Sequence, residues 1–355
     1  MKILINTPDI SLLGGVANHY EGLRPYWKLK VHYNFIGGRK KIPGPLILPF
    51  DLIKFFFLCR FGNYDLVVLN PSLGSTAIKR DALFLKIASI TKKETLVFWH
   101  GWSPELVERI NNDSSWFKRK YDLASMHLVL SGAFKKDLIN WGIKSPIKLT
   151  TTKVDDRLIA NFEIQKKQVP DFTILFLTRV EVYKGIFIVL EACEDFLKQG
   201  GSFRLVIAGE GSQLEAAKDY VKKKKLQNVH FLGNVSGEQL IQAFEDASIY
   251  ILPSYSEGMP TSVLEAMAFG LPVITRPVGG INDFFEEGKM GYLVKSLNST
   301  DFAEKISYML EHPTIIKEIG EFNHFYAKKH FMASEVALKM EGFFKMVLQK
   351  DFKEK

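Results

Sequence analysis

The stretch that decides the fold is residues 248–275, SIYILPSYSEGMPTSVLEAMAFGLPVIT. Its apolar run at 248–252 has the length and composition of a buried strand. After a Gly-containing loop, Pro260 stands at the first position of a helix predicted over 261–269, and a second strand is predicted at 272–275. Strand, helix and strand in so short a segment predict a βαβ unit, whose parallel strands are buried on both faces.

The same alternation extends outward in both directions. Apolar runs bounded by turn residues predict further strands at 173–178, 203–208, 229–231 and 291–294, and at 2–6, 65–69, 95–99 and 127–130. Amphipathic segments predict helices at 184–198, 212–224 and 237–247, and at 75–90, 104–111 and 132–141. Ten strands favour two sheets of ordinary width over one wide sheet. The sequence therefore predicts an α/β protein with domains at 1–160 and 161–332 and a last helix at 333–355.

Composition excludes several classes of protein. The 355 residues are 46% hydrophobic and 24% charged, which is too apolar for a disordered chain. Two cysteines, Cys59 and Cys193, exclude a disulfide scaffold and a multi-cysteine zinc site and suit a reducing compartment. The first residues do not form a signal peptide, and no apolar run reaches the roughly 18–20 residues of a spanning helix. These features predict a cytoplasmic protein.

The net charge of +8 is distributed unevenly. Residues 1–160 carry 24 Lys/Arg and 13 Asp/Glu, a balance of +11, whereas residues 161–355 carry 23 and 26, a balance of −3. A basic half favours nucleic acid, an anionic membrane surface or a large anionic substrate. Because no RNA- or DNA-binding motif accompanies the basic residues, nucleic acid is the poorest of these hypotheses.

Ligands of open α/β sheets bind beyond the carboxyl ends of the strands, so the residues that follow each strand are the candidates. Gly14-Gly15 follows the first strand and precedes a helix, where glycine allows a ligand close to the backbone. The pattern is not GxGxxG, so it does not support a nicotinamide site. An ordinary turn is the alternative interpretation of this pair.

Two cations flank the next candidate loop. Arg179 ends a predicted strand and Lys184 begins a predicted helix, where a positive charge opposes the helix dipole. An anion such as a diphosphate would neutralise both, with arginine as a planar fork and lysine as a point charge. Two solvated surface cations are the alternative.

The opening stretch contributes two carboxylates. Glu257 lies in the loop before the helix, and Glu265 lies on the helix, on the face shared by Thr261 and Phe269. Carboxylates are good hydrogen-bond partners for sugar hydroxyls. A lone acidic residue at such a loop usually serves the helix N-terminus, but a pair in this setting favours a ligand site.

With these residues in place, the chain resembles the retaining GT-B glycosyltransferases of family 4. The signature of that family is two glutamates separated by seven residues, as Glu257 and Glu265 are, and Arg179 and Lys184 stand where the family carries its donor-phosphate cations. The resemblance is dense over about 174–294 and sparse over the first 150 residues. Further matching positions are Gly14-Gly15, Gly209-Glu210-Gly211, Phe231–Val235, Gly279-Gly280-Ile281, Gly288 and Gly291–Val294.

The resemblance implies two Rossmann-like domains facing across a cleft, with the last helix crossing back to the N-terminal domain. It implies that Arg179 and Lys184 neutralise the diphosphate of a nucleotide-sugar donor, and that Glu265 binds the ribose. Glu257 would hold the donor sugar. The remaining donor-binding positions carried over from the family are Gly14, Gly15, Gly209, Val235 at the base, and Gly258, Met259 and Pro260 beside the sugar.

His100 follows the predicted strand at 95–99 and precedes Gly101. A lone histidine is more often structural, but family members that resemble this chain place a histidine at this junction against the donor sugar. The resemblance thus adds His100 to Glu257, Arg179 and Lys184 as a catalytic candidate. No second ligand stands at metal-binding spacing, and the family usually needs no metal, so no metal and no cofactor beyond the donor are expected.

The implied reaction moves a sugar from a nucleotide-diphosphate sugar to a glycan or lipid-linked acceptor with retention, in cell-surface polysaccharide or glycolipid synthesis. No carboxylate stands as an obvious nucleophile, which favours a same-face mechanism in which the leaving phosphate helps deprotonate the acceptor. A nucleotide-sugar epimerase and a binding protein without turnover remain alternatives. The donor base, the sugar and the acceptor are not encoded by these motifs.

One segment of the basic half suggests a membrane contact. Arg39-Lys40-Lys41 precedes the apolar, proline-broken stretch 42–58, IPGPLILPFDLIKFFFL, which fits an interfacial segment that touches an anionic membrane without spanning it. A core helix beside a loop is the alternative. The protein is therefore expected in the cytoplasm, with peripheral association at the inner membrane face as a hypothesis.

Overall fold

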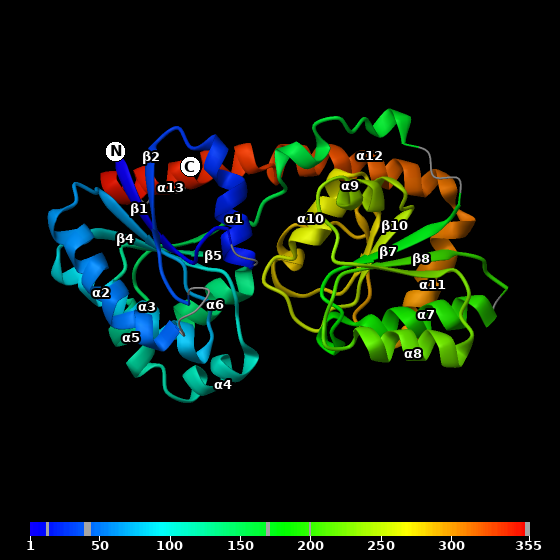
Figure 1. Ribbon diagram of the computed structural model, residues 1–355, viewed down its shortest axis with the longest axis horizontal. Coiled ribbons are helices and arrows are strands. Elements are labelled where there is room, and N and C mark those ends of the chain that lie inside the picture. Colours follow the sequence, from blue (N-terminus) through cyan, green and yellow to red (C-terminus); the bar gives the residue numbers. More distant parts are fainter. Residues whose placement is uncertain (12–13, 39–43, 168–170, 199, 352–355) are drawn as a thin grey trace. The chain divides into compact units, whose positions relative to one another are not determined.

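A computed structural model describes residues 1–11, 14–38, 44–167, 171–198 and 200–351 of the chain. The chain divides into two compact units, here called unit 1 (Met1–Lys153 with Ala333–Lys355) and unit 2 (Val154–Met332) (Figure 1). Each unit holds a six-stranded sheet in which all strands are parallel. The predicted α/β architecture with two Rossmann-like sheets is confirmed.

The sheet of unit 1 has the strand order β2-β1-β3-β4-β5-β6. Two of its strands were not predicted, because β2 is a half-exposed edge strand with polar residues and β6 has only three residues. The four central strands, which are almost wholly buried, occur where the apolar runs predict them. The bounds are β1 Lys2–Thr7, β2 Lys30–Phe35, β3 Leu66–Leu69, β4 Glu94–Trp99, β5 Met126–Val129 and β6 Ile147–Leu149.

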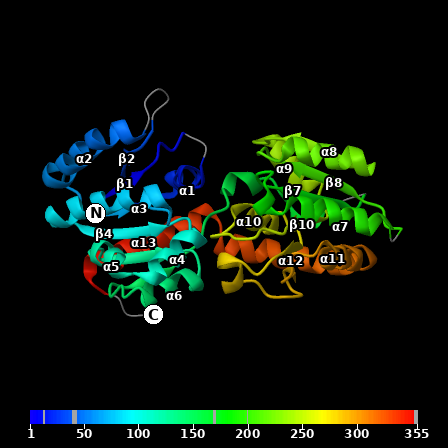
Figure 2. The same ribbon diagram turned by 90° about the horizontal axis from the view of Figure 1, so that it is seen from below.

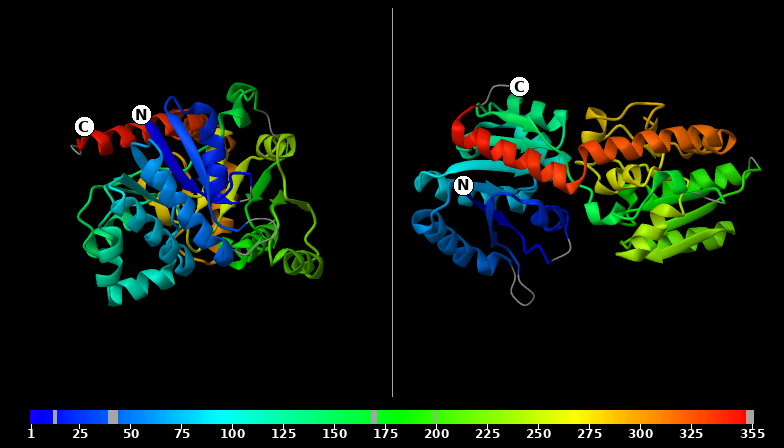
Figure 3. Two further views of the ribbon diagram at one scale, coloured as in Figure 1. Left: turned by 60° about the vertical axis from the view of Figure 1, so that its left-hand side comes forward. Right: turned by 90° about the horizontal axis from the view of Figure 1, so that it is seen from above.

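Helices cover both faces of this sheet. One face carries α1 and α13, which pack against each other, and the other carries α2, α3 and α5 (Figures 1 and 3). The bounds are α1 Gly15–Leu23, η1 Arg24–Tyr26, α2 Gly44–Phe61, α3 Ser75–Ile90, α4 Pro104–Asn112, α5 Ser115–Tyr121, α6 Gly132–Asn140 and α13 Ala333–Gln349.

The last helix, α13, belongs to unit 1 although it follows the whole of unit 2 along the chain. The Phe344 ring lies 5.9 Å from the Trp27 ring, and the buried Glu341 carboxylate accepts hydrogen bonds from the backbone N–H groups of Lys28 (2.6 Å) and Leu29 (2.9 Å). The return of the chain to the N-terminal domain is therefore confirmed.

The sheet of unit 2 has the order β12-β11-β10-β7-β8-β9. Helices α7 and α8 lie on one face and α9 and α10 on the other, while α11 packs on α7 and α12 on α10 (Figures 1 and 2). The strands are β7 Thr173–Leu177, β8 Arg204–Ala208, β9 Val229–Gly233, β10 Ile249–Leu252, β11 Val273–Thr275 and β12 Gly291–Leu293. The helices are η2 Asp156–Ile159, η3 Ile164–Lys166, η4 Val182–Lys184, α7 Ile186–Lys198, α8 Leu214–Lys224, α9 Glu238–Glu245, α10 Thr261–Ala268, η5 Gly279–Asp283, α11 Ser299–Glu311 and α12 Pro313–His330.

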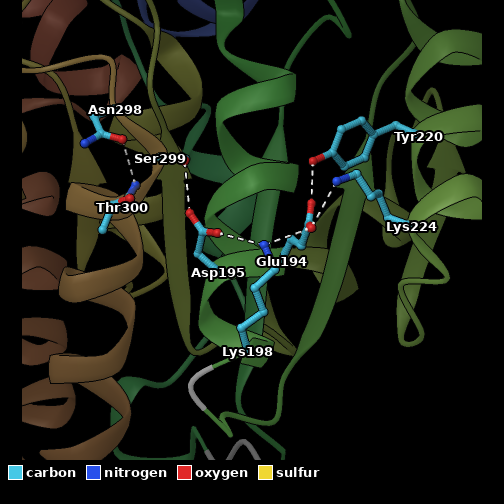
Figure 4. A network of polar contacts seen from close by, with 8 residues as sticks. All are labelled: Glu194, Asp195, Lys198, Tyr220, Lys224, Asn298, Ser299 and Thr300. Atoms are coloured by element: carbon cyan, nitrogen blue, oxygen red, sulfur yellow. Dashed lines mark hydrogen bonds and ion pairs between the residues drawn. The ribbon is translucent and has the colours of Figure 1, made fainter.

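A network of charged side chains ties α7, α8 and α11 together (Figure 4). Glu194 accepts hydrogen bonds from the Tyr220 hydroxyl (2.7 Å) and the Lys224 ammonium (3.1 Å). Lys198 bridges the Glu194 carboxylate at 3.0 Å and the Asp195 carboxylate at 3.4 Å. Hydrogen bonds from Tyr220 and Lys198 lower the pKa of Glu194 to about 2. The lysines of this surface are thus balanced by carboxylates of the same unit.

The strand order of each sheet places a crevice at its carboxyl edge. In unit 2 the chain leaves β7 toward β8 and leaves β10 toward β11, on opposite sides of the sheet, so the topological switch point falls between β7 and β10. In unit 1 the same reversal falls between β1 and β3. Ligands of open α/β sheets bind at such switch points, so these two positions are the candidate ligand sites.

Candidate active site

The candidate donor residues of unit 2 gather at the carboxyl edge of its sheet. Each follows the end of a different strand or lies on the helix that begins there, so parallel strands bring positions far apart in sequence to one edge. They are Arg179 after β7, Gly209 after β8, Val235 after β9, Glu257, Gly258, Met259 and Pro260 after β10, and Glu265 on α10.

An ion pair joins the loops on either side of the β7–β10 crevice. The Lys184 ammonium lies 2.5 Å from the Glu257 carboxylate, and the two side chains are only 13% and 9% exposed. The sequence predicts that Lys184 opens a helix, which is wrong by two residues. Lys184 closes the 3-10 turn η4, and α7 begins at Ile186 because Gly185 between them is left-handed, with φ +84°.

Close backbone packing holds these two loops together. A Cβ atom on Gly185 would lie 2.6 Å from Pro253, and the Tyr255 backbone N–H donates to the Tyr183 carbonyl at 2.9 Å. The guanidinium of the exposed Arg179 lies 5.5 Å from the centre of the Tyr183 ring, and the Lys184 ammonium lies 5.7 Å from it. The two cations therefore lie beside the same aromatic ring.

Two glycines after β8 allow the chain to pack closely against the backbone on either side of Arg179. Gly209 has φ +139°, and a Cβ atom there would overlap the Thr178 carbonyl oxygen. A Cβ atom on Gly211 would overlap the Val180 carbonyl oxygen in the same way. Only glycine fits both positions without moving the chain, so the Gly-Glu-Gly motif fixes where Arg179 leaves the sheet.

The two carboxylates of the signature act on one buried hydroxyl. Tyr250 donates to the Leu177 carbonyl at 2.9 Å and accepts from the Ser262 hydroxyl at 2.7 Å. Burial raises the pKa of Tyr250, and the negative charges of Glu257 and Glu265 raise it further. Glu265 itself is only 8% exposed. Sequence reasoning missed Tyr250, whose signal was a hydroxyl inside an otherwise aliphatic strand.

Helix α10 begins at Thr261, where the predicted range 261–269 begins, but Pro260 is not its first helical residue. Pro260 is the N-cap residue, with extended backbone, and the first helical residue is Thr261. The Pro260 carbonyl accepts the Val263 N–H at 3.1 Å, and the helix has no capping side chain. The N–H groups of its first turn thus stand at the crevice beside Glu257.

In unit 1, His100 directly follows β4, as the sequence predicts. Backbone hydrogen bonds fasten its loop to the loop after β3: the His100 N–H donates to Pro71 (3.0 Å), and the Leu73 N–H donates to Gly101 (2.7 Å). A Cβ atom on Gly101 would lie 3.1 Å from Ser72, so the two loops approach closely.

The His100 ring is held by Asn70, which sequence reasoning missed. The Asn70 amide nitrogen donates to the Asn6 carbonyl at 3.0 Å, so its oxygen faces the Tyr20 hydroxyl (2.6 Å) and His100 Nε2 (3.0 Å). Because that oxygen only accepts, His100 Nε2 carries the proton. Burial lowers the pKa of His100 to about 3, so the ring is neutral and Nδ1 is a hydrogen-bond acceptor.

A second histidine, His19 on α1, lies behind His100. The two ring centroids are 5.4 Å apart and edge-on, and both His19 nitrogens are buried without a hydrogen-bond partner among the described residues. Burial lowers the pKa of His19 well below its usual range, and the nearby Lys153 charge lowers it further. The Lys153 ammonium, which donates to Asn18 at 3.2 Å, occupies the space a Cβ atom on Gly22 would take.

Gly14 and Gly15 stand at the start of α1, after β1, as predicted. A Cβ atom on either glycine would meet no atom within 4 Å, and α1 has neither a capping side chain nor an acidic residue in its first turn. Packing therefore does not require glycine here. Gly14, Gly15 and His100 belong to unit 1, whereas the other candidates belong to unit 2.

Among the residues that the structure describes, no group of three or more His, Cys, Asp or Glu side chains could hold a metal ion. Unit 2 has a separate pocket at the opposite, amino-terminal end of its strands, lined by Lys167, Phe172 and Ser248 among others. Lys167 there donates to the carbonyls of Phe244 (2.9 Å) and Phe269 (3.3 Å), which end α9 and follow α10. That pocket contains none of the candidate residues.

Comparison with known proteins gives a consistent result. Residues 159–324 match the family model described as glycosyl transferases group 1. The N,N'-diacetylbacillosaminyl-diphospho-undecaprenol alpha-1,3-N-acetylgalactosaminyltransferase of Campylobacter jejuni is 30% identical over 74% of this chain and 73% of its own length. The putative colanic acid biosynthesis glycosyltransferase WcaL of Escherichia coli is 24% identical over 66% and 58%.

Among solved structures, Anabaena HepE in complex with UDP and glucose has a TM-score of 0.73 at 18% identity, over 97% of this chain and 99% of that one. This likeness establishes the GT-B fold. The matched segments cover 43% and 58% of the first two curated relatives, so the chain spans about half of their length.

Proposed function

The chain belongs to the glycosyl transferases of group 1, and on this premise we propose that it transfers a sugar from a nucleoside diphosphate sugar to a glycan or lipid-linked acceptor, with retention. The observation that carries the proposal is the convergence of Arg179, Lys184 and Glu257 at the β7–β10 crevice. Two cations and a carboxylate at a switch point suit a ligand with both phosphate and sugar hydroxyl groups.

Departure of the nucleoside diphosphate places negative charge on its phosphate oxygens. Arg179, Lys184 and the first-turn N–H groups of α10 are positioned by their loops before any ligand arrives, so they stabilise this charge without rearranging solvent. Removing one preorganised donor of this kind costs about 10²–10³-fold in turnover.

The carboxylates bind hydroxyl groups in this proposal. Glu265, nearly buried on α10, binds the donor ribose, and Glu257 binds the donor sugar beside the backbone of Gly258, Met259 and Pro260. The family positions further assign Val235 to the base and Gly14 and Gly15 to the phosphates. Tyr250 links the end of β7 to the start of α10, the helix that carries Glu265.

In this proposal, His100 supplies a hydrogen-bond acceptor for the donor sugar. Its neutral ring, with the proton fixed on Nε2 by Asn70, leaves Nδ1 to accept a hydrogen bond from a hydroxyl of the donor sugar. Retention follows the same-face course, in which the leaving phosphate helps deprotonate the acceptor hydroxyl. No metal ion has a role in this scheme.

The acceptor proposal draws on the relatives and on charge. The C. jejuni relative is named for an acceptor carrying diphospho-undecaprenol, and WcaL for colanic acid synthesis. The excess positive charge of this chain lies in residues 1–160, away from Arg179 and Lys184. An anionic acceptor such as a diphosphate-linked lipid saccharide, in cell-surface polysaccharide synthesis, matches this distribution.

The test is a screen of UDP-, GDP- and ADP-sugars for binding, slow donor hydrolysis, and transfer to lipid-linked or glycan acceptors, with the anomer of the product read by NMR. We expect one nucleotide to bind and to be turned over. Glu257→Gln should lower turnover about 10²-fold, whereas Glu304→Gln on the exposed surface of α11 should not change it. Conversion of the donor without an acceptor would instead support an epimerase, binding without turnover would support a binding protein, and an inverted product would refute retention.

A further inference from the structure

Helix α2 is apolar on its inner face, where it packs on the sheet and on α3. Ile47, Phe55 and Cys59 are buried there, and the Phe55 ring contacts the Phe84 ring of α3 edge-on at 5.0 Å between centroids. This face is an ordinary part of the core of unit 1.

The outer face of α2 is apolar as well. Residues spaced four, three, four and four apart share one side of a helix, and the residues at this spacing on the outer side of α2 are all large and hydrophobic. Their exposed fractions lie between 55% and 73%, and they are Leu46, Phe50, Ile53, Phe57 and Phe61. On the neighbouring helix α3, Leu83 and Ile90 are exposed too. We call these seven residues the apolar stripe.

The sequence left two interpretations of residues 42–58, an interfacial segment and a core helix. The structure shows a helix with one core face and one unpartnered apolar face, so the interpretations are not exclusive. The basic triplet Arg39-Lys40-Lys41 lies outside the described residues.

The exposed charges on the three helices of this face of the sheet, α2, α3 and α5, are of one sign. On α2, α3 and α5 the acidic residues are Asp51 and Asp81, each 1% exposed: Asp51 accepts the Gly37 N–H at 2.8 Å, and Asp81 pairs with Arg80 at 2.7 Å. The exposed charged side chains of these three helices are all cations, namely Lys54, Arg60, Lys79, Lys86, Arg119 and Lys120.

The surface of unit 2 shows that such an imbalance is not general. On α7 and α8, Lys198 and Lys224 meet the carboxylates of Glu194 and Asp195 (Figure 4). On α2, α3 and α5 no exposed carboxylate is present to pair with the exposed cations. An exposed apolar surface of this kind marks an interaction site, and the charge around it specifies an anionic partner.

We propose that the apolar stripe and its rim of cations dock unit 1 onto an anionic lipid bilayer. A bilayer is apolar beneath an anionic surface, which matches both parts of this face. A second copy of the chain, placed on the same face, would set cations against cations. No helix in the described part of the chain is long and apolar enough to cross a membrane, so α2 lies on the surface with its outer side chains among the acyl chains.

This inference goes beyond the proposed transfer reaction and does not depend on it. The stripe lies on the helices of unit 1, whereas Arg179, Lys184 and Glu257 belong to unit 2. Donor binding and hydrolysis in the absence of membranes can therefore succeed or fail separately from lipid binding.

The experiment is co-sedimentation of the full chain with vesicles of phosphatidylcholine alone and of phosphatidylcholine mixed with an equal part of phosphatidylglycerol, at low and high salt. We expect binding to the anionic vesicles, weakened by salt. Lys79→Gln with Lys86→Gln should weaken it about 30-fold. Phe50→Gln with Phe57→Gln should weaken it about 100-fold or more, because two phenyl groups no longer enter the bilayer.

Matched controls come from unit 2. Phe325 is 56% exposed on α12, and Lys222 and Lys223 are exposed on α8. Phe325→Gln, and Lys222→Gln with Lys223→Gln, should leave vesicle binding unchanged. Equal binding to neutral and anionic vesicles, or an unaltered affinity in the Phe50/Phe57 variant, would overturn the proposal. So would a dimer in light scattering that disappears in that variant, because the stripe would then be an interface between copies.

Discussion

The two units present different chemistry at the same position of the same fold. At the carboxyl edge of unit 2, charged side chains meet: Lys184 pairs with Glu257, and Arg179 stands beside them. At the carboxyl edge of unit 1, Asn70, Tyr20 and His100 form a neutral network. In the proposed function, unit 2 would balance the charge of the donor, and unit 1 would offer uncharged hydrogen bonds.

Buried histidines mark the same contrast. Burial lowers the pKa of His100 to about 3 and of His127 to about 4, and it lowers that of His19 well below its usual range. In unit 2, burial lowers the pKa of His324, whose Nδ1–H donates to the Ala268 carbonyl at 2.6 Å. The buried imidazoles of unit 1 are therefore neutral, whereas the candidate site of unit 2 holds the Lys184–Glu257 ion pair.

The largest expected effect is the loss of the unit 2 cations. Arg179→Ala and Lys184→Ala should each lower turnover about 10²–10³-fold, because each removes a charge that stabilises the leaving diphosphate. Steady-state kinetics measures this. Arg204→Ala, an exposed arginine at the opposite end of the sheet, is the control and should keep full activity. Equal activity of all three variants would contradict the charge-balancing role of unit 2.

Acid should destabilise unit 1. Histidine in the unfolded chain has a pKa near 6.5, so the unfolded state binds protons between pH 7 and 5 that His100 and His127 do not bind in the native state. Stability is then lost as the pH falls, by about 2 kcal/mol per histidine at pH 5.

All five tryptophans lie in unit 1, so their fluorescence reports this unit alone during thermal unfolding. We expect the fluorescence midpoint to fall between pH 7 and 5. The variant His127→Gln should show a shallower dependence on pH, because it removes one of the buried rings that bind a proton only after unfolding. A midpoint that does not change over this range would show that the histidines are not held neutral.

Asn70→Leu tests the neutral network directly. The substitution leaves the Tyr20 hydroxyl and His100 Nε2 without their acceptor, which should cost about 1–3 kcal/mol of stability. In ¹⁵N NMR of the histidine ring we expect the single Nε2–H tautomer of the parent protein to be replaced by a mixture. If the tautomer stays unchanged, Asn70 does not position His100.

The smallest effect concerns Gly15. A Cβ atom there meets nothing, so Gly15→Ala should raise the stability of α1 by about 0.5–1 kcal/mol. It should nevertheless weaken donor binding if glycine serves close approach of a ligand. Gly342→Ala on α13 also adds a Cβ atom in open space and should raise stability without affecting binding. Identical behaviour of the two variants would assign Gly14-Gly15 to an ordinary turn.

The sequence predicted unit 2 better than unit 1 for a physical reason. Charged residues and glycines at strand ends can be recognised directly in the sequence, because few structural roles explain a cation or a glycine at that position. The close approach of Gly209 to Thr178 and the Lys184–Glu257 pair both occur at positions that the motifs single out. Even so, the pairing itself was not predicted, since spacing does not say which charges meet.

The network of unit 1 could not be predicted, because Asn70, Tyr20 and His19 belong to residue types that are common in any fold. Their roles arise from the parallel register that brings the ends of β1, β3 and β4 together. The strands β2 and β6 were missed because edge strands lack the continuous apolar runs of buried ones.

The ion pair between Lys184 and Glu257 has a consequence for how a reaction cycle ends. In the proposed reaction, Glu257 and the donor diphosphate compete for the same ammonium group, because the Glu257 carboxylate already pairs with Lys184. When the nucleoside diphosphate leaves, the Glu257 carboxylate pairs with Lys184 again. The largely buried ammonium group is therefore never without a counter-ion. Inhibition by free nucleoside diphosphate should accordingly be weaker in the parent protein than in the Glu257→Gln variant. The ion pair lowers the affinity for the product and so speeds its release.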